Sequence, residues 1–175
     1  VGAVLADAAA ARAAGADVVI LSIQWGNEYQ VEPSLIQKQQ ATALLESDYI
    51  DLIVGSHVHV VQPIDIINGK YVFYGLGNFL SNQSAACCPA ASQNGIMAFF
   101  DVVEEGEEHV IENLSFIPTR VDRSNYTIIP LPQALEDSDI EGGLRDLYET
   151  VIVDTAEVLG ALGVEIPIWD YSAES

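Results

Sequence analysis

Two of the three histidines in the chain, His57 and His59, stand one residue apart. They lie in the segment GSHVHVVQP, directly after the apolar run IDLIV, which predicts a buried strand. Side chains two residues apart in an extended segment point to the same side, so both imidazoles are expected to face one point in space. Imidazole nitrogens bind zinc, iron, manganese or nickel, and this pair could supply two metal ligands. The alternative is that both rings only hydrogen-bond loop carbonyls.

Polar side chains at two further strand ends are expected to join the histidine pair. Gln24 closes the apolar run DVVILSIQ, and Asn78 follows the segment YVFYGLG. Ligands of α/β proteins bind beyond the carboxyl ends of the strands. We therefore predict that Gln24, Asn78 and the two histidines share one edge of the sheet.

Other aromatic and charged residues are weaker candidates for a site. Trp25 and Tyr29 could line a substrate cleft, although packing in the core or at its rim is the simpler interpretation. Arg120 and Arg123 are notable because the chain has only 6 basic residues. Either could contact an anion, but a salt bridge to the acidic surface is the expected role. His109 lies among glutamates and is expected at the surface.

Helices and strands alternate in the first half of the chain. An alanine-rich helix is expected over residues 1–14, followed by a strand over 16–24 that is buried on both faces. Ser34 caps a second amphipathic helix over 34–46, and the next buried strand spans 49–55. This order predicts an α/β fold with two adjacent parallel strands joined by a right-handed crossover.

Turn signals mark the second half of the sheet as antiparallel. Asn68-Gly69 predicts a hairpin, and Glu105-Gly106 predicts the turn of another strand pair at an edge of the same sheet. The chain after Pro132 is expected to be helical, with a break at Gly142-Gly143. The segment 164–175 is expected to lie over the surface and to end disordered. The fold class is therefore a layered, mixed parallel and antiparallel sheet flanked by helices.

The charge balance restricts the possible partners. The chain has 26 acidic and 6 basic residues, for a formal net charge of −20. Such a surface repels nucleic acid and anionic membranes, so neither is an expected partner. It also works against direct binding of a polyanionic substrate unless a cation mediates. No apolar run approaches the roughly 20 residues of a membrane helix.

The only cysteines, Cys87 and Cys88, are adjacent in the sequence. Two interpretations stay open: free thiols in a mobile loop, which is favoured, or a vicinal disulfide. Either way the pair lacks the CxxC spacing of a zinc site.

Three segments, taken together and in order, resemble the CapA family of bacterial capsule or poly-γ-glutamate synthesis proteins: DVVILSIQWGNEY, DLIVGSHVHVVQPIDIINGKYVFYGLGNF and FIPTRVDR. The resemblance implies a calcineurin-like metallophosphoesterase fold with a divalent metal (manganese, iron or zinc). It also implies an extracytoplasmic place in the cell envelope, with an envelope polymer or other capsule-synthesis proteins as partners. Residues 1–130 are accordingly predicted to be the C-terminal part of such a domain, and residues 131–175 a helical extension and tail.

The resemblance also suggests roles for single residues. His57 and His59 match the two histidines of the family's GHxH element and are implied metal ligands. His59 and Asn78 are the implied catalytic residues, and Gln24 and Trp25 the implied substrate contacts. Gln24 departs from the family pattern, because it stands where the family usually has a ligand histidine. The upstream Asp-x-His, Gly-Asp and Asn-His elements of the superfamily are absent from this sequence.

Two functional hypotheses follow from these observations. In the first, the protein is a metal-dependent hydrolase of capsule polymer metabolism. In the second, it is a non-catalytic envelope module that binds polymer or partner proteins. The retained histidines and Asn78 favour the first, and Gln24 favours the second. We expect this chain to bind metal weakly, to show little phosphoesterase activity and to form a homo-oligomer.

Overall fold

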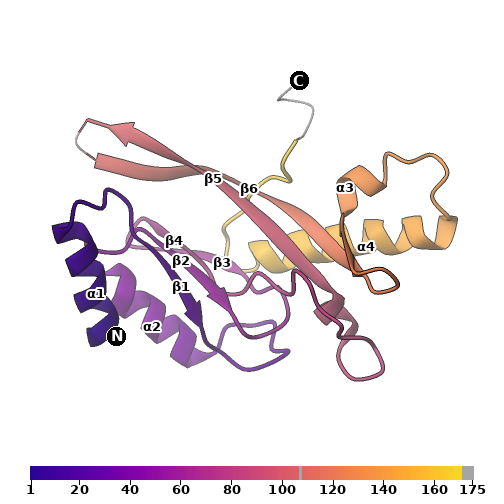
Figure 1. Cartoon of the computed structure of the whole chain (residues 1–175), viewed down its shortest axis with the longest axis horizontal. Coiled ribbons are helices and arrows are strands. Elements are labelled where there is room, and N and C mark those ends of the chain that lie inside the picture. The colour runs from indigo at the N-terminus through magenta and orange to yellow at the C-terminus, as the bar shows by residue number, and fades with distance from the viewer. Residues whose placement is uncertain (107, 171–175) are drawn as a thin grey trace.

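The computed structural model describes residues 1–106 and 108–170 and has two β-sheets with flanking helices (Figure 1). The first sheet contains β1 (Ile20–Gln24), β2 (Leu52–Ser56), β3 (Ile64–Ile67) and β4 (Lys70–Phe73). The second contains β5 (Asn94–Glu105), β6 (Glu108–Asp122) and β7 (Thr127–Pro130). The helices are α1 (Gly2–Ala13), α2 (Leu35–Leu45), the short 3-10 helix η1 (Ala90–Gln93), α3 (Leu131–Ala134) and α4 (Gly142–Gly160). The predicted α/β fold class with a mixed sheet is confirmed.

The first sheet has the strand order β1-β2-β4-β3. β1 and β2 run parallel, with Ile20 opposite Leu52 and Gln24 opposite Ser56, and α2 connects them. This arrangement confirms the predicted parallel pair with its helical crossover. β3 and β4 form an antiparallel hairpin that turns at Asn68 and Gly69, as predicted.

β1 differs from the prediction of a strand buried on both faces. Along β1, exposed residues alternate with partly buried ones, and Ile20 is 46% exposed. The reason is its position: β1 lies at the edge of the sheet and pairs only with β2. Leu21 and Ile23 pack against the cluster beneath α1 and α2, while the alternate side chains face away from it.

The start of α2 follows from its sequence. The Ser34 hydroxyl accepts a hydrogen bond from the Gln37 backbone N–H, and the Gln37 side chain accepts one from the Ser34 backbone N–H. This capping box satisfies two backbone donors at the helix start. The sequence pattern predicts one apolar face made of Leu35, Ala41, Leu44 and Leu45. The last three are buried as expected, but Leu35 is 70% exposed, so its predicted place on this face is wrong.

The strands after residue 94 form a separate sheet, which corrects the prediction that they extend the first one. β5 and β6 pair antiparallel and β7 pairs with β6, so the predicted antiparallel pairing is right (Figure 1). Leu52 and Phe73 from the first sheet pack with Phe116 from the second and with Leu159 of α4 in one buried cluster. The two sheets and the C-terminal helix therefore share a core.

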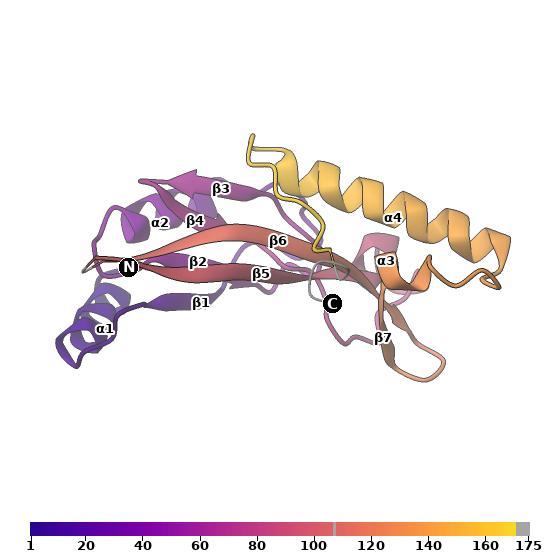
Figure 2. The same cartoon turned by 90° about the horizontal axis from the view of Figure 1, so that it is seen from above.

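The C-terminal region is helical, but the break lies before the predicted glycine pair. α3 ends at Ala134, and Gly142 and Gly143 begin α4 instead of interrupting it. The segment after α4 returns to β6 (Figure 2). There the Trp169 backbone N–H donates to the Phe116 carbonyl, and the Trp169 ring stacks on Phe99. The predicted disordered end, residues 171–175, lies outside the described residues. Within the described part of the chain, no helix is long and apolar enough to span a membrane.

Candidate functional site

The candidate site lies where β1 and β2 end together. Gln24 and Ser56 are paired in register at the ends of these strands, and His57 follows directly. Gln24 and His57 are both exposed, whereas Val58 is only 1% exposed and fills the core. The structure thus places the predicted glutamine and histidine at the same edge of the sheet.

The backbone at the histidines is not extended, which corrects the reasoning from the sequence. His57 has φ +95° and His59 has φ +62°, so both residues adopt a conformation that is rare outside glycine. Their ring centroids nevertheless lie 6.3 Å apart, with the ring planes tilted by 41°. Such backbone strain persists only where the surrounding structure holds it, and it is concentrated at functional sites.

His59 is held by Asn78. The imidazole Nδ1 lies 2.9 Å from the amide Oδ1 of Asn78. The Asn78 amide nitrogen donates to the Ser92 carbonyl at 2.8 Å and to Gln83 Oε1 at 3.2 Å. Because a carbonyl can only accept, these bonds fix the orientation of the Asn78 amide and present its oxygen to His59. The neutral His59 ring therefore carries its proton on Nδ1 and keeps a lone pair on Nε2.

Tyr29 completes the surroundings of His59. Its ring stacks on the imidazole with centroids 5.8 Å apart, and its backbone N–H donates to the Val58 carbonyl at 2.7 Å. Its hydroxyl accepts a hydrogen bond from Gln83 Nε2 at 3.2 Å. The hydroxyl also contacts the sulfur of Cys88 at 3.7 Å. The ring of His59 is thus fixed by one stacked face and one hydrogen bond.

Cys87 and Cys88 form a vicinal disulfide. Of the two interpretations left open by the sequence, the structure has the less favoured one. Through the contact between Cys88 and Tyr29, this disulfide adjoins the residues that hold His59.

Trp25 has a packing role. Its side chain is 6% exposed, its Nε1 donates to the Tyr74 carbonyl at 2.8 Å, and the two rings stack with centroids 5.7 Å apart. Packing was the simpler interpretation of its sequence position. A ring buried in this way offers almost no surface to a substrate, so the structure lends no support to the predicted substrate contact.

The bend that carries Asn78 depends on Gly77. This glycine has φ +75°, and a Cβ there would lie 2.6 Å from the Asn94 carbonyl oxygen. The Asn78 backbone N–H donates to that same oxygen at 3.2 Å. The close approach of the bend to the start of β5 brings Asn78 within reach of Ser92.

Sequence reasoning missed the residues that support the site. Gln83 and Ser92 orient Asn78, and neither belongs to a pattern that signals this role. Gln62 and Gln37 form a buried side-chain hydrogen bond of 2.8 Å, and Gln62 also donates to the Gln30 carbonyl. Gln62 lies in the histidine segment itself. A polar residue directly after two valines was the signal that could have indicated its buried hydrogen bonds.

The described residues do not fit a divalent metal on their own. Within residues 1–106 and 108–170, no group of three or more histidine, cysteine, aspartate or glutamate side chains gathers in a metal-binding arrangement. His57 and His59 supply two nitrogen donors at most, and a stable zinc site takes at least three protein ligands. Gln24 adds only a neutral amide, which is a poor ligand for a transition metal.

Comparison with known proteins finds a partial family match in the part of the chain that contains this edge. A family model described as bacterial capsule synthesis protein PGA_cap matches residues 1–83. These residues are similar to that family. The match is partial, and it includes the histidine pair, Gln24, Trp25 and Asn78.

Two curated proteins are similar to part of this chain. PGA biosynthesis protein CapA of Bacillus subtilis (strain 168) is 44% identical over 68 residues, which are 39% of this chain and 18% of that protein. Capsule biosynthesis protein CapA of Bacillus anthracis is 41% identical over 68 residues, which are 39% of this chain and 16% of that protein. The aligned part of the chain therefore spans less than a fifth of the length of either relative.

Proposed function

We propose that the chain acts in the biosynthesis of a capsule or of poly-γ-glutamate, and that the edge formed by His59 and Asn78 binds the polymer or a precursor. The observation that carries the proposal is the position of this edge within the segment that matches the capsule synthesis family. The relatives' names supply the substrate class. Their place in polymer synthesis also supports an extracytoplasmic position at the envelope, with the polymer or other capsule-synthesis proteins as partners.

A binding role agrees with the chemistry of the edge. The His59 ring is fixed by Asn78 and by Tyr29, so its Nε2 is presented at low entropic cost. Nε2 accepts a hydrogen bond when the ring is neutral and pairs with a carboxylate when the ring is charged. The exposed amide of Gln24, at the end of β1, can both donate and accept. These groups suit a substrate made of amides and carboxylates, with solution cations offsetting the repulsion between such a polyanion and the net charge of −20.

A metal-dependent hydrolase with a metallophosphoesterase-like fold is the second candidate function. The hydrogen bond from His59 Nδ1 to an amide oxygen is the observation in its favour, because metal-binding histidines usually donate their other ring nitrogen in this way. A bound divalent metal would polarise the scissile group. His57 and His59 could supply two ligands of such a metal. Its remaining ligands would have to come from outside the described residues.

Deletion of the encoding gene in its host tests the proposed function. We expect the deletion strain to lose cell-associated capsule polymer or poly-γ-glutamate, and a wild-type copy of the gene to restore it. Unchanged amounts and chain lengths of polymer in the deletion strain would refute the proposal.

Metal analysis and a hydrolysis assay separate the two candidates. We expect the purified chain to retain little metal after dialysis and to hydrolyse neither a generic phosphoester nor poly-γ-glutamate when manganese is added. Stoichiometric bound metal together with steady turnover would favour the hydrolase and overturn the purely binding role.

A further inference from the structure

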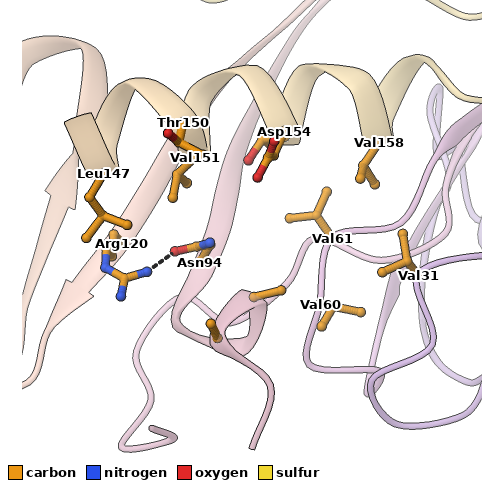
Figure 3. Close-up of a pocket in the computed structure, with 13 residues that line it drawn as sticks. Val31, Val60, Val61, Asn94, Arg120, Leu147, Thr150, Val151, Asp154 and Val158 are labelled. Atoms are coloured by element: carbon orange, nitrogen blue, oxygen red, sulfur yellow. Dashed lines mark hydrogen bonds between the residues drawn. The ribbon is translucent and has the colours of Figure 1, made fainter. Parts of the chain in front are cut away.

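A small cavity of about 230 Å³ lies between α4 and the segment that follows His59 (Figure 3). Its walls are mostly apolar and include Val61 and Val158, while Arg120 and Asp154 supply charged groups. Ligand pockets for drug-sized molecules begin at about 300 Å³, so this cavity suits one small unit of a longer ligand.

Arg120 lies at this cavity and has no carboxylate partner among the residues that the structure describes. Its guanidinium donates to Asn94 Oδ1 at 2.5 Å (Figure 3). It also donates to Gln93 Oε1 at 3.2 Å, and both acceptors are neutral amides. Among the described residues, the only salt bridges are Arg12 with Asp51 and Lys38 with Glu32. The salt bridge predicted for Arg120 from the sequence is therefore wrong.

The environment of Arg120 favours an added anion. Its side chain is partly buried, and this burial lowers the pKa of Arg120 below its ordinary value, while the guanidinium still stays charged at neutral pH. Within residues 1–106 and 108–170, the two amide acceptors engage only two of the five N–H donors of the planar fork. A carboxylate would supply both the missing charge and the acceptor geometry that the fork matches.

The cavity adjoins the candidate site. Val61 lies two residues after His59, and the Asn94 backbone carbonyl accepts the hydrogen bond from the Asn78 N–H. A ligand at the His59 edge could therefore extend into the cavity over a short distance. Remote contacts of this kind position a long substrate at the main site.

We propose that this cavity binds one carboxylate-bearing glutamyl unit, with the carboxylate on Arg120 and the methylene groups against the apolar wall. This inference rests on the proposed function, which supplies the polymer. Asp154 lines the same cavity and repels a second negative charge, so the subsite accepts one carboxylate and not a cluster of them.

Titration of the purified chain with a γ-linked glutamate trimer at fixed salt tests the subsite. We expect Arg120→Gln to weaken binding about tenfold or more, since a charge-assisted hydrogen bond is lost. Arg123→Gln removes the same charge from an exposed residue of the neighbouring turn and should change binding less than about twofold. Asp154→Asn should strengthen binding.

A second variant guards against misfolding of Arg120→Gln. Ala91 lines the cavity and is exposed, so Ala91→Leu should occupy part of the cavity without breaking a side-chain hydrogen bond. It should weaken trimer binding while thermal unfolding stays as in the wild type. A trimer that binds both variants as tightly as the wild type would overturn the subsite and leave the proposed function standing.

A short aliphatic monocarboxylate separates the two proposals. Suppose that this probe binds the wild type, that it does not bind Arg120→Gln, and that the trimer binds neither protein. In that case the carboxylate site stands and the polymer function fails. If neither probe binds the folded wild type, the subsite is refuted.

Discussion

The imidazole Nδ1 of His59 and the amide Oδ1 of Asn78 are joined at 2.9 Å, although 19 residues separate them in the chain. Asn78 can hold this position because its amide nitrogen is bound to the Ser92 carbonyl. The arrangement selects one tautomer of the histidine and directs its other nitrogen away from Asn78. It also links the histidine segment to the bend after β4. As a result, the neutral His59 ring offers the lone pair of its Nε2 at this edge of the sheet.

Asn78→Ala should release the His59 ring. Without the amide oxygen, the Nδ1-protonated tautomer loses its preference and the more common Nε2-protonated form gains population. Nitrogen-15 NMR of the histidine side chains measures this change directly. His109, on β6, serves as the internal control and should not respond. An unchanged His59 spectrum in Asn78→Ala would show that the contact does not form in solution.

Gly55→Ala should destabilise the fold strongly. A Cβ at Gly55 would collide with the Tyr74 carbonyl oxygen and with the Trp25 indole nitrogen, which are hydrogen-bonded to each other. We expect a loss of about 3 kcal/mol in the free energy of unfolding. Gly143→Ala is the matched control, because a Cβ there meets nothing within 4 Å and the residue is helical.

The control should raise the free energy of unfolding by roughly 0.5 kcal/mol. Both values can be measured by denaturant unfolding. Equal stability of the two variants would contradict the packing described for β2 and Trp25.

Much of the fold was predictable because local patterns specify it. Ser34 is a capping signal and Asn68-Gly69 marks a tight hairpin, and both are present as expected. The membership of β5 and β6 in a second sheet was not predictable, because alternating apolar residues predict a strand pair without indicating which sheet it joins.

The site was predictable only in outline. The convergence of His59 and Asn78 follows from the ends of neighbouring strands, which sequence periodicity reveals. The left-handed backbone at His57 and His59 was missed because these residues rarely adopt it. Ser92 was missed because its contribution is a backbone carbonyl, which carries no sequence signal.

The Tyr74 phenol should make stability fall at high pH. Burial first, and the negative charge of Asp65 second, raise the pKa of Tyr74 from 10.0 to about 12. The Tyr74 hydroxyl has no hydrogen-bond partner among the described residues, so we attribute the effect of Asp65 to its charge. Because the folded state prefers the neutral phenol, Tyr74 contributes to the free energy of unfolding. This contribution is fully present below pH 10 and is lost as the pH rises through about 12.

Ultraviolet titration of phenolate absorbance checks the pKa of Tyr74. One of the 7 tyrosines should titrate last, and Asp65→Asn should lower its pKa only in part, since burial is the larger cause. In Tyr74→Phe the late step should be absent. A wild-type titration with all tyrosines ionising together near pH 10 would refute the burial described here.

Reduction of the vicinal disulfide should change global stability little. Cys87 and Cys88 are neighbours, so their bond closes almost no loop in the unfolded chain. We expect the free energy of unfolding with and without dithiothreitol to agree within about 1 kcal/mol. The Cys87→Ser, Cys88→Ser double variant should be insensitive to the reductant. If reduction lowered the free energy of unfolding by several kcal/mol, the disulfide would be stabilising structure beyond its own loop, contrary to this prediction.

The most direct test of the central claim compares two histidines in the living cell. The deletion strain would receive the gene with either His59→Ala or His109→Ala, each checked for equal protein abundance, and its cell-associated polymer would be measured. We expect His59→Ala to leave the polymer at the level of the deletion strain and His109→Ala to restore it to the wild-type level. Full restoration by His59→Ala would contradict the claim that the edge formed by His59 and Asn78 is the functional site.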